Sequence, residues 1–238
     1  MIASTKTDHD LRDSHTAWKR LAVGVVIGTI GSVGMWSFVV ALSAVQADFG
    51  ISRAQAALPY TLSMAGFAFG GVMMGRLCDR LGLMTPLFIG AICLGAGYIG
   101  SSFATNVVIY TMMQALIGFG ASASFVPIMS DLSHWFIKYR GIAVAIASCG
   151  NYLAGTIWPP LLYLGIERLG WRDIHLITGL VCLATLLPLA GLMRSKHAVR
   201  TNTMTQADQD TPGPQVSERL LLTVSYTHLR AHETREDL

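Results

Sequence analysis

The stretch Gly75-Arg-Leu-Cys-Asp-Arg-Leu-Gly82 decides how this chain folds. It carries two arginines and one aspartate, and it lies between two apolar runs, residues 58–75 and 86–103. Each run approaches the length of about 20 residues that a helix needs to cross a bilayer. Two spanning helices joined by so few residues must be antiparallel neighbours. We therefore expect the charged stretch to lie at a membrane surface.

The composition is that of a membrane protein. Apolar residues make up 52% of the chain and charged residues 13%, whereas about 25% of the residues in a soluble domain are charged. The four cysteines show no paired spacing and lie in or beside apolar runs, so we expect small buried hydrophobic side chains rather than disulfides or metal ligands. They are Cys78, Cys93, Cys149 and Cys182.

Six apolar runs predict an all-α membrane protein with six transmembrane helices. Spanning segments in lipid must satisfy their own backbone groups, and continuous rather than alternating apolar runs exclude a β-barrel. A cytoplasmic tail (1–20) precedes the predicted six-helix bundle (21–194), and a flexible cytoplasmic segment (195–238) follows it. The runs are residues 21–45, 58–75, 86–103, 107–130, 141–164 and 174–193.

Lysine and arginine are distributed unevenly among the connections between these runs. Positive residues gather in the connections that stay on the cytoplasmic side. The pattern therefore predicts that both termini are cytoplasmic. One side carries Lys6, Arg12, Lys19, Arg20, Arg76, Arg80, Lys138, Arg140, Arg194, Lys196 and Arg200, and the other carries Arg53, Arg168 and Arg172.

Two short features concern the relation between the helices. Asp79-Arg-Leu-Gly82 follows the second run, and Glu167-Arg-Leu-Gly170 follows the fifth. A shift of three helices places the two copies on opposite sides of the membrane, as an inverted three-plus-three repeat would. Glycines also recur at four-residue spacing, which permits close helix approach in lipid and leaves open a gating role. These pairs are Gly24 and Gly28, Gly66 and Gly70, and Gly71 and Gly75.

The last residues of the chain, 220–238, differ in character from the rest. His228 and His232 are spaced as two ligands on one helical turn could be, but no third ligand stands near them, so we expect no metal site. This ending is similar to the tails of truncated or misassembled reading frames. We leave it out of the fold prediction, and whether the chain is a natural product stays open.

Three stretches resemble the signatures of one transporter family. Gly75-x-Leu-x-Asp79-Arg80-x-Gly82 resembles the signature between the second and third helices of the major facilitator superfamily. Residues 135–143 (WFIKYRGIA), continuing to Gly150, are similar to the fourth-to-fifth-helix signature of its monocarboxylate porter family. Gly170-Trp-Arg172, with a sixth helix ending at residues 191–193, resembles the next landmark of that family. The resemblance covers about residues 18–194.

This resemblance implies two six-helix bundles around a central site, of which only the N-terminal bundle is present here. It implies a secondary active transporter in the cytoplasmic (plasma) membrane that moves a small organic anion, such as a monocarboxylate, by rocking of the bundles. The chain departs from the family at Leu83 and Met84, where bases are usual, and at Gln114, where many members have arginine. Residues 38–45 also lack the lysine of lactate carriers, which argues against lactate–proton symport.

The resemblance assigns a conformational role to the charged end of the bundle. Asp79 would latch the two bundles by accepting hydrogen bonds from a helix N-terminus of the second bundle; alternatively, Arg76 and Arg80 only anchor the loop in the cytoplasm. Asp131 is expected to reach one of these arginines, and Lys138 and Arg140 are either gate residues or topological determinants. The full set of gate and signature candidates is Gly75, Arg76, Asp79, Arg80, Gly82, Asp131, Lys138 and Arg140.

The substrate path is expected along the first and fourth helices. Its candidates are the polar or aromatic residues Ser32, Trp36 and Gln114, together with Asn151 in the fifth helix. An amide in lipid needs a partner, so a neighbouring helix is the alternative to a substrate. The acids and bases lie at helix ends, which predicts no proton relay in this bundle.

No other class of function is favoured by the sequence. There is no catalytic dyad, metal cluster or Walker-type loop, so we expect no enzyme, cofactor or direct use of ATP, and nothing indicates a nucleic-acid partner. The lipid bilayer, a small solute and a second bundle are the expected partners. A six-helix sensor or assembly partner, or a non-functional half-transporter, remains the alternative.

Overall fold

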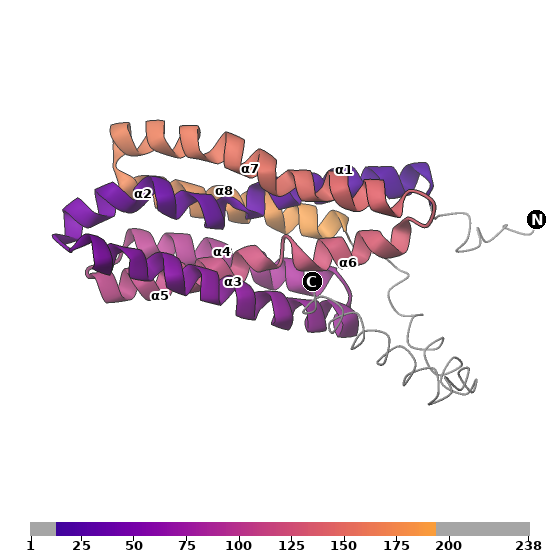
Figure 1. Ribbon diagram of the computed structural model, residues 1–238, viewed down its shortest axis with the longest axis horizontal. Coiled ribbons are helices and arrows are strands. Elements are labelled where there is room, and N and C mark those ends of the chain that lie inside the picture. The colour runs from indigo at the N-terminus through magenta and orange to yellow at the C-terminus, as the bar shows by residue number, and fades with distance from the viewer. Residues whose placement is uncertain (1–12, 194–238) are drawn as a thin grey trace, which may run out of the picture. The chain divides into compact units, whose positions relative to one another are not determined.

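The computed structural model describes residues 13–193. The predictions for residues 1–12 and for the segment 195–238, including His228 and His232, lie outside the described residues. The described part contains eight helices (Figure 1). They are α1 (His15–Gly31), α2 (Val33–Phe49), α3 (Arg53–Leu81), α4 (Met84–Ser102), α5 (Val107–Ser122), α6 (Val126–Trp135), α7 (Arg140–Leu169) and α8 (Trp171–Leu192).

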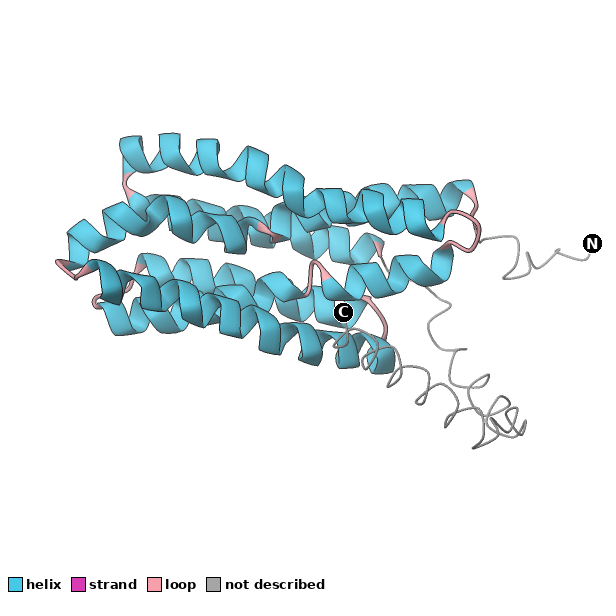
Figure 2. Ribbon diagram, viewed as in Figure 1, coloured by secondary structure: helices cyan, strands magenta, loops and turns pink. Residues whose placement is uncertain are grey.

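These helices form six spans, which confirms the predicted number. Within residues 13–193 the helices are joined by short loops, and no strand occurs (Figure 2). Six segments are long and apolar enough to cross a membrane. The first consists of α1 and α2, the fourth of α5 and α6, and the others of one helix each. The helices of the second and fifth spans, α3 and α7, extend beyond the predicted runs. Hydropathy marks the length of a helix that faces lipid rather than the ends of the helix.

The first and fourth spans are broken, which the sequence analysis did not predict. The break in the first span lies at Ser32, where the Trp158 Nε1 donates to the carbonyl of Thr29 at 2.8 Å. Pro159 and Pro160 follow Trp158, yet α7 continues through both prolines. Backbone carbonyls exposed at a break need partners in an apolar interior, and here a neighbouring span supplies one.

The break in the fourth span covers residues 123–125. Ser122 and Ser124 donate their hydroxyl protons to the carbonyls of Phe119 and Ala121, each at 2.7 Å. At both breaks, side-chain donors therefore bond backbone carbonyls near the interruption. The two broken spans are also the first members of the two predicted three-helix repeats.

The ends of α3 and α7 support the internal repeat. Gly82 ends α3 with φ 79° and ψ 170°, and Gly170 ends α7 with φ 87° and ψ 161°. Each glycine N–H donates to a carbonyl four residues earlier, at Cys78 and Ile166. Positive φ favours glycine at both positions. The short sequence echo thus corresponds to one turn geometry used twice.

Glycines let two pairs of helices approach closely. Gly66 of α3 lies against the backbone of Ala115, and Gly118 of α5 lies against the Ser63 carbonyl, so that a Cβ at either glycine would clash. At the contact of α7 with α1, a Cβ on Gly150 would lie 2.9 Å from the Val25 carbonyl oxygen. Small residues have this role in lipid because burial of apolar surface contributes little to helix association there.

The connections divide the bundle into two ends (Figure 1). We call one end the basic end; it holds the start of α1, the α3–α4 and α6–α7 connections and the end of α8. The opposite end holds the α2–α3, α4–α5 and α7–α8 connections. The positive residues Lys19, Arg20, Arg76, Arg80, Lys138 and Arg140 all belong to the basic end.

Candidate functional site

The signature at the basic end is built by the last turns of α3. Gly75, Arg76, Asp79 and Arg80 lie on this helix, and Gly82 ends it. The side chains of Arg76, Asp79 and Arg80 are exposed. None of the three forms a hydrogen bond or an ion pair with another residue among 13–193. The Asp79 carboxylate therefore stabilises no contact within the described bundle.

Asp131 pairs with Arg20, so the expected contact with Arg76 or Arg80 is wrong. The Arg20 Nε lies 2.6 Å from Asp131 Oδ2 and its Nη2 lies 3.0 Å from Oδ1, which makes the pair bidentate. The two side chains are only 9% and 16% exposed. The Arg20 guanidinium also lies 4.9 Å from the ring centre of Trp135. Arg20 lies on α1 and Asp131 on α6, so this largely buried pair joins the two helices.

Asp13 closes the start of α7. Its carboxylate accepts backbone hydrogen bonds from Ile137, Lys138 and Tyr139 at 3.3, 3.0 and 3.4 Å. Its own N–H donates to the Trp135 carbonyl at 3.1 Å. The hydrogen bond from the Lys138 N–H is the main cause that lowers the pKa of Asp13 below its ordinary value of 3.8, and the other two N–H groups act in the same direction.

This contact should depend on pH only in acid. Because the pKa of Asp13 is lower in the folded state, its contribution to folding is fully present above about pH 4 and is lost as the pH falls through the lowered value. The protection factors of the amides of residues 137–139, which are the intrinsic exchange rates divided by the observed ones, should thus be high at neutral pH and fall in strong acid. Asp13→Ala removes the accepting oxygens and should lower the protection of the same amides at neutral pH. Equal protection in that variant and the parent protein would contradict the capping role.

Lys138 and Arg140 lie beside this cap. Lys138 lies over the Tyr139 ring, with its Nζ 5.3 Å from the ring centre, and Arg140 begins α7. Both side chains are exposed. Their positions fit either the gate role or the topological role, and the choice between these stays a prediction.

The four residues predicted for the substrate path are not joined to one another by hydrogen bonds. Ser32 is buried at the α1–α2 break. Trp36 of α2 packs against α7 at Gly155. Gln114 of α5 is 0% exposed, and its amide interacts with the Tyr110 hydroxyl one turn away. The buried carbonyl oxygen of Asn151 has no hydrogen-bond partner among the described residues. No hydrogen bond joins any two of the four residues, all of which the structure describes.

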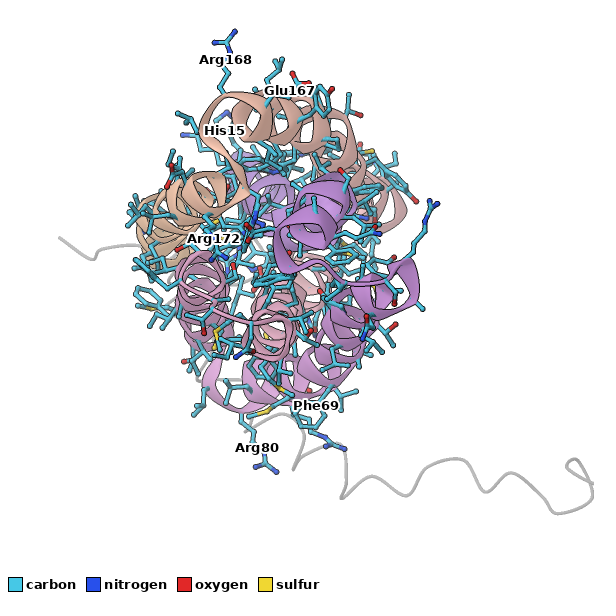
Figure 3. All side chains as sticks on the ribbon, turned by 90° about the vertical axis from the view of Figure 1, so that its left-hand side faces the viewer. His15, Phe69, Arg80, Glu167, Arg168 and Arg172 are labelled. Carbon is cyan, nitrogen blue, oxygen red and sulfur yellow. The ribbon has the colours of Figure 1, made fainter. Side chains whose placement is uncertain are left out.

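Arg172 joins three elements at the opposite end. Its Nη2 donates to Asp48 Oδ2 at 2.7 Å, and its Nη1 donates to the carbonyls of Ser102 and Ala104 at 3.2 and 2.6 Å. The guanidinium lies 4.4 Å from the ring centre of Trp171. Figure 3 views this end and shows Arg172 among the helix ends. Arg172 was part of a family landmark in the sequence, but its partners could not be predicted.

A buried histidine near this end was missed by the sequence analysis. His175 is 1% exposed, and its Nδ1 lies 3.1 Å from the Ser101 hydroxyl. Its ring contacts the rings of Tyr98, Tyr110 and Trp171. The signal was available, because His175 is an ionisable residue within an apolar run. His175 lies in the second turn of α8, near a helix end, but its side chain is buried, which the sequence analysis did not consider.

Comparison with known proteins decides the family. The model of the Major Facilitator Superfamily matches residues 24–231. The chain belongs to the major facilitator superfamily. This places it in a family of membrane transporters rather than among enzymes, as the sequence motifs predicted. The matched range extends beyond the described residues.

Individual members of the superfamily show the same relationship. Human monocarboxylate transporter 11 is 32% identical over 120 residues, covering 48% of this chain and 26% of that protein. Human monocarboxylate transporter 6 is 26% identical over 174 residues, covering 70% of this chain and 34% of the relative. The probable sulfoacetate transporter SauU of Cupriavidus necator is 24% identical over 145 residues, covering 60% and 34%. The matched part of the chain thus spans between about a quarter and a third of the length of these relatives.

Proposed function

We propose that this chain is the N-terminal bundle of a secondary active transporter that moves a small organic anion by rocking-bundle alternating access. The observation that carries the proposal is Asp79. It lies in the superfamily signature at the basic end, it is exposed, and it has no partner among the described residues. A second bundle would provide that partner.

The surfaces of α3 and α7 support docking of a second bundle. In the most apolar 18-residue stretch of each of these helices only 22% is buried inside the bundle, compared with 50% for α4. Large aromatic side chains are uncovered on both, including Phe69 of α3 and Tyr152 of α7. Figure 3 shows Phe69 and Arg80 on the flank of the bundle opposite to Glu167 and Arg168. In the proposed transporter these two helices contact the second bundle and lipid.

The membrane arrangement belongs to the same proposal. The basic end is placed in the cytoplasm because it carries most of the lysine and arginine in the connections. Both termini of the bundle are then cytoplasmic, and the membrane is the plasma membrane. Reagents that modify a cysteine introduced at Arg80 only from the cytoplasmic side would support this orientation, and labelling only from outside would overturn it.

The names of the relatives suggest the class of solute. They refer to monocarboxylates and to sulfoacetate, which are organic anions. The candidates along the path in this bundle are uncharged: Ser32, Trp36, Gln114 and Asn151. The buried carbonyl oxygen of Asn151 has no partner among the described residues and can accept a hydrogen bond. The cation that balances the solute's charge is therefore assigned to the second bundle.

Counterflow in liposomes tests the proposal. The protein with both bundles should exchange a labelled monocarboxylate or sulfoacetate against the same unlabelled anion. The uncharged amide of each acid is the matched control and should not exchange. Failure of every anion with correctly folded protein would favour a non-transporting membrane protein. Equal exchange of acids and amides would contradict the proposal that the solute is an anion, but not the proposal that the protein is a transporter.

Asp79→Asn tests the latch. Removing the charge should reduce uptake about tenfold, which corresponds to about 1.4 kcal/mol in the balance between two conformations. Membrane insertion should not change, because Asp79 has no partner within the described bundle. Glu167→Gln is the matched control, since Glu167 has the equivalent place in the repeat at the opposite end. Undiminished uptake by Asp79→Asn would leave only the anchoring role of this loop.

A further inference from the structure

His175 lies within a layer of aromatic rings where α8 packs against α4 and α5. Its ring is nearly parallel to that of Tyr110, at 9° with the centres 5.9 Å apart. The rings of Tyr98 and Trp171 meet it edge-on, each at 5.5 Å. Trp171 and Tyr110 also contact Phe49 of α2. The layer therefore joins four helices.

The hydrogen bonds around His175 favour one tautomer of its ring. The Ser101 hydroxyl donates its single proton to the Tyr98 carbonyl at 2.8 Å. It can then only accept at the His175 Nδ1, 3.1 Å away, so Nδ1 carries the proton of the neutral ring. The Nε2 is a bare acceptor, buried and without a hydrogen-bond partner among the described residues. A buried polar atom without a partner is unusual and calls for an explanation.

Protonation of Nε2 would create a buried cation without an acceptor for its new N–H. The groups that face the ring from α4 and α5 are the neutral phenols of Tyr98 and Tyr110, and on α8 the thiol of Cys182 lies two turns away. Beyond Trp171, the charged groups are Arg172 and Asp48, which are paired with each other, and Asp173 in the first turn of α8, whose side chain is exposed. No carboxylate among residues 13–193 forms an ion pair with His175.

We propose that His175 is a proton-binding site that controls the packing of α8 against α4 and α5. The neutral ring belongs to the packed aromatic layer. When the layer separates, Nε2 gains access to water and takes up a proton, and the imidazolium then disfavours repacking. Acid reaching the opposite end therefore loosens this part of the bundle. The proposal does not depend on which solute is carried, or on transport itself.

The tautomer is tested first, in the unaltered protein. Nitrogen NMR of protein labelled at histidine and held in lipid nanodiscs should show the Nδ1–H tautomer for His175 at about pH 7.5, with His175→Asn used to assign the signal. Acidification to below about pH 4 should convert it to the doubly protonated ring. An Nε2–H tautomer at neutral pH, or a ring that stays neutral in acid, would overturn the proposal. If His175→Asn does not fold, replacing the other six histidines one at a time leaves the remaining signal assigned to His175.

The packing is tested through Cys182, whose side chain is 0% exposed. In protein with the other three cysteines replaced by serine, a small disulfide reagent that reacts in acid should label Cys182 about threefold faster at pH 5 relative to the same protein carrying His175→Asn. The ratio should be near one at pH 7.5. Asp48→Asn breaks the ion pair between Arg172 and Asp48 and serves as a control. This variant should keep the labelling response that depends on His175. The same acid response with and without His175, or loss of the response only in Asp48→Asn, would contradict the proposal.

Discussion

Replacing Asp131 by Leu should lower the free energy of unfolding by about 3 kcal/mol, because it leaves the Arg20 guanidinium buried without its partner. Removing one member of a buried ion pair costs more than the pair contributes, since the remaining charge loses both water and its counter-ion. The bidentate geometry, with distances of 2.6 and 3.0 Å, makes the loss larger than for an exposed pair. Denaturant titration of the protein in micelles measures it.

The matched control removes both charges. Arg20→Met combined with Asp131→Leu should recover most of the lost stability, because the apolar pair has no charge to solvate. A double-mutant cycle separates the interaction between the two residues from their individual effects. If the double variant is as unstable as Asp131→Leu alone, the ion pair is not what stabilises this edge. A loss below about 1 kcal/mol would mean that water reaches the pair.

Gly118→Ala should destabilise the bundle by about 3 kcal/mol, near the upper end for overpacking. The added methyl group meets the backbone carbonyl of Ser63 rather than a flexible side chain, so α3 and α5 must move apart. Contacts along α3, including that of Gly66 with Ala115, are lost with this movement. The same titration in micelles should show a lower midpoint.

Gly141→Ala is the opposite control. Gly141 lies in the first turn of α7, and a methyl group there meets no atom within 4 Å. Alanine is about 1 kcal/mol more favourable than glycine in a helix, so this variant should be neutral or slightly more stable. If both glycine variants lose stability equally, the close approach of α3 and α5 is not the cause.

The spans and the gathering of charges at one end could be predicted because both follow from composition along the chain. A run of apolar residues shows how much lipid a segment can cross, and a cluster such as Arg76 and Arg80 shows where a connection lies. The turn at Gly82 and its copy at Gly170 could also be found, because positive φ leaves a glycine in the sequence.

The contacts within the bundle could not be predicted in this way. Arg20 and Asp131 are 111 residues apart, and the sequence around either residue does not indicate its partner. The break at Ser32 leaves no signal in hydropathy, because its freed carbonyl is satisfied by Trp158 from a distant span. His175 could have been suspected as an ionisable residue in an apolar run, but its aromatic surroundings come from α4 and α5.

The long sequence separations at the basic end have a consequence for biosynthesis. The start of α1 makes its main polar contacts, through Asp13 and Arg20, with residues 131–139. A ribosome adding 5–20 residues per second needs on the order of ten seconds to produce that stretch. During this interval the first helix has left the translocon with a cation and a carboxylate unmatched. Water and lipid headgroups at the membrane surface solvate these two charges until residues 131–139 have been made.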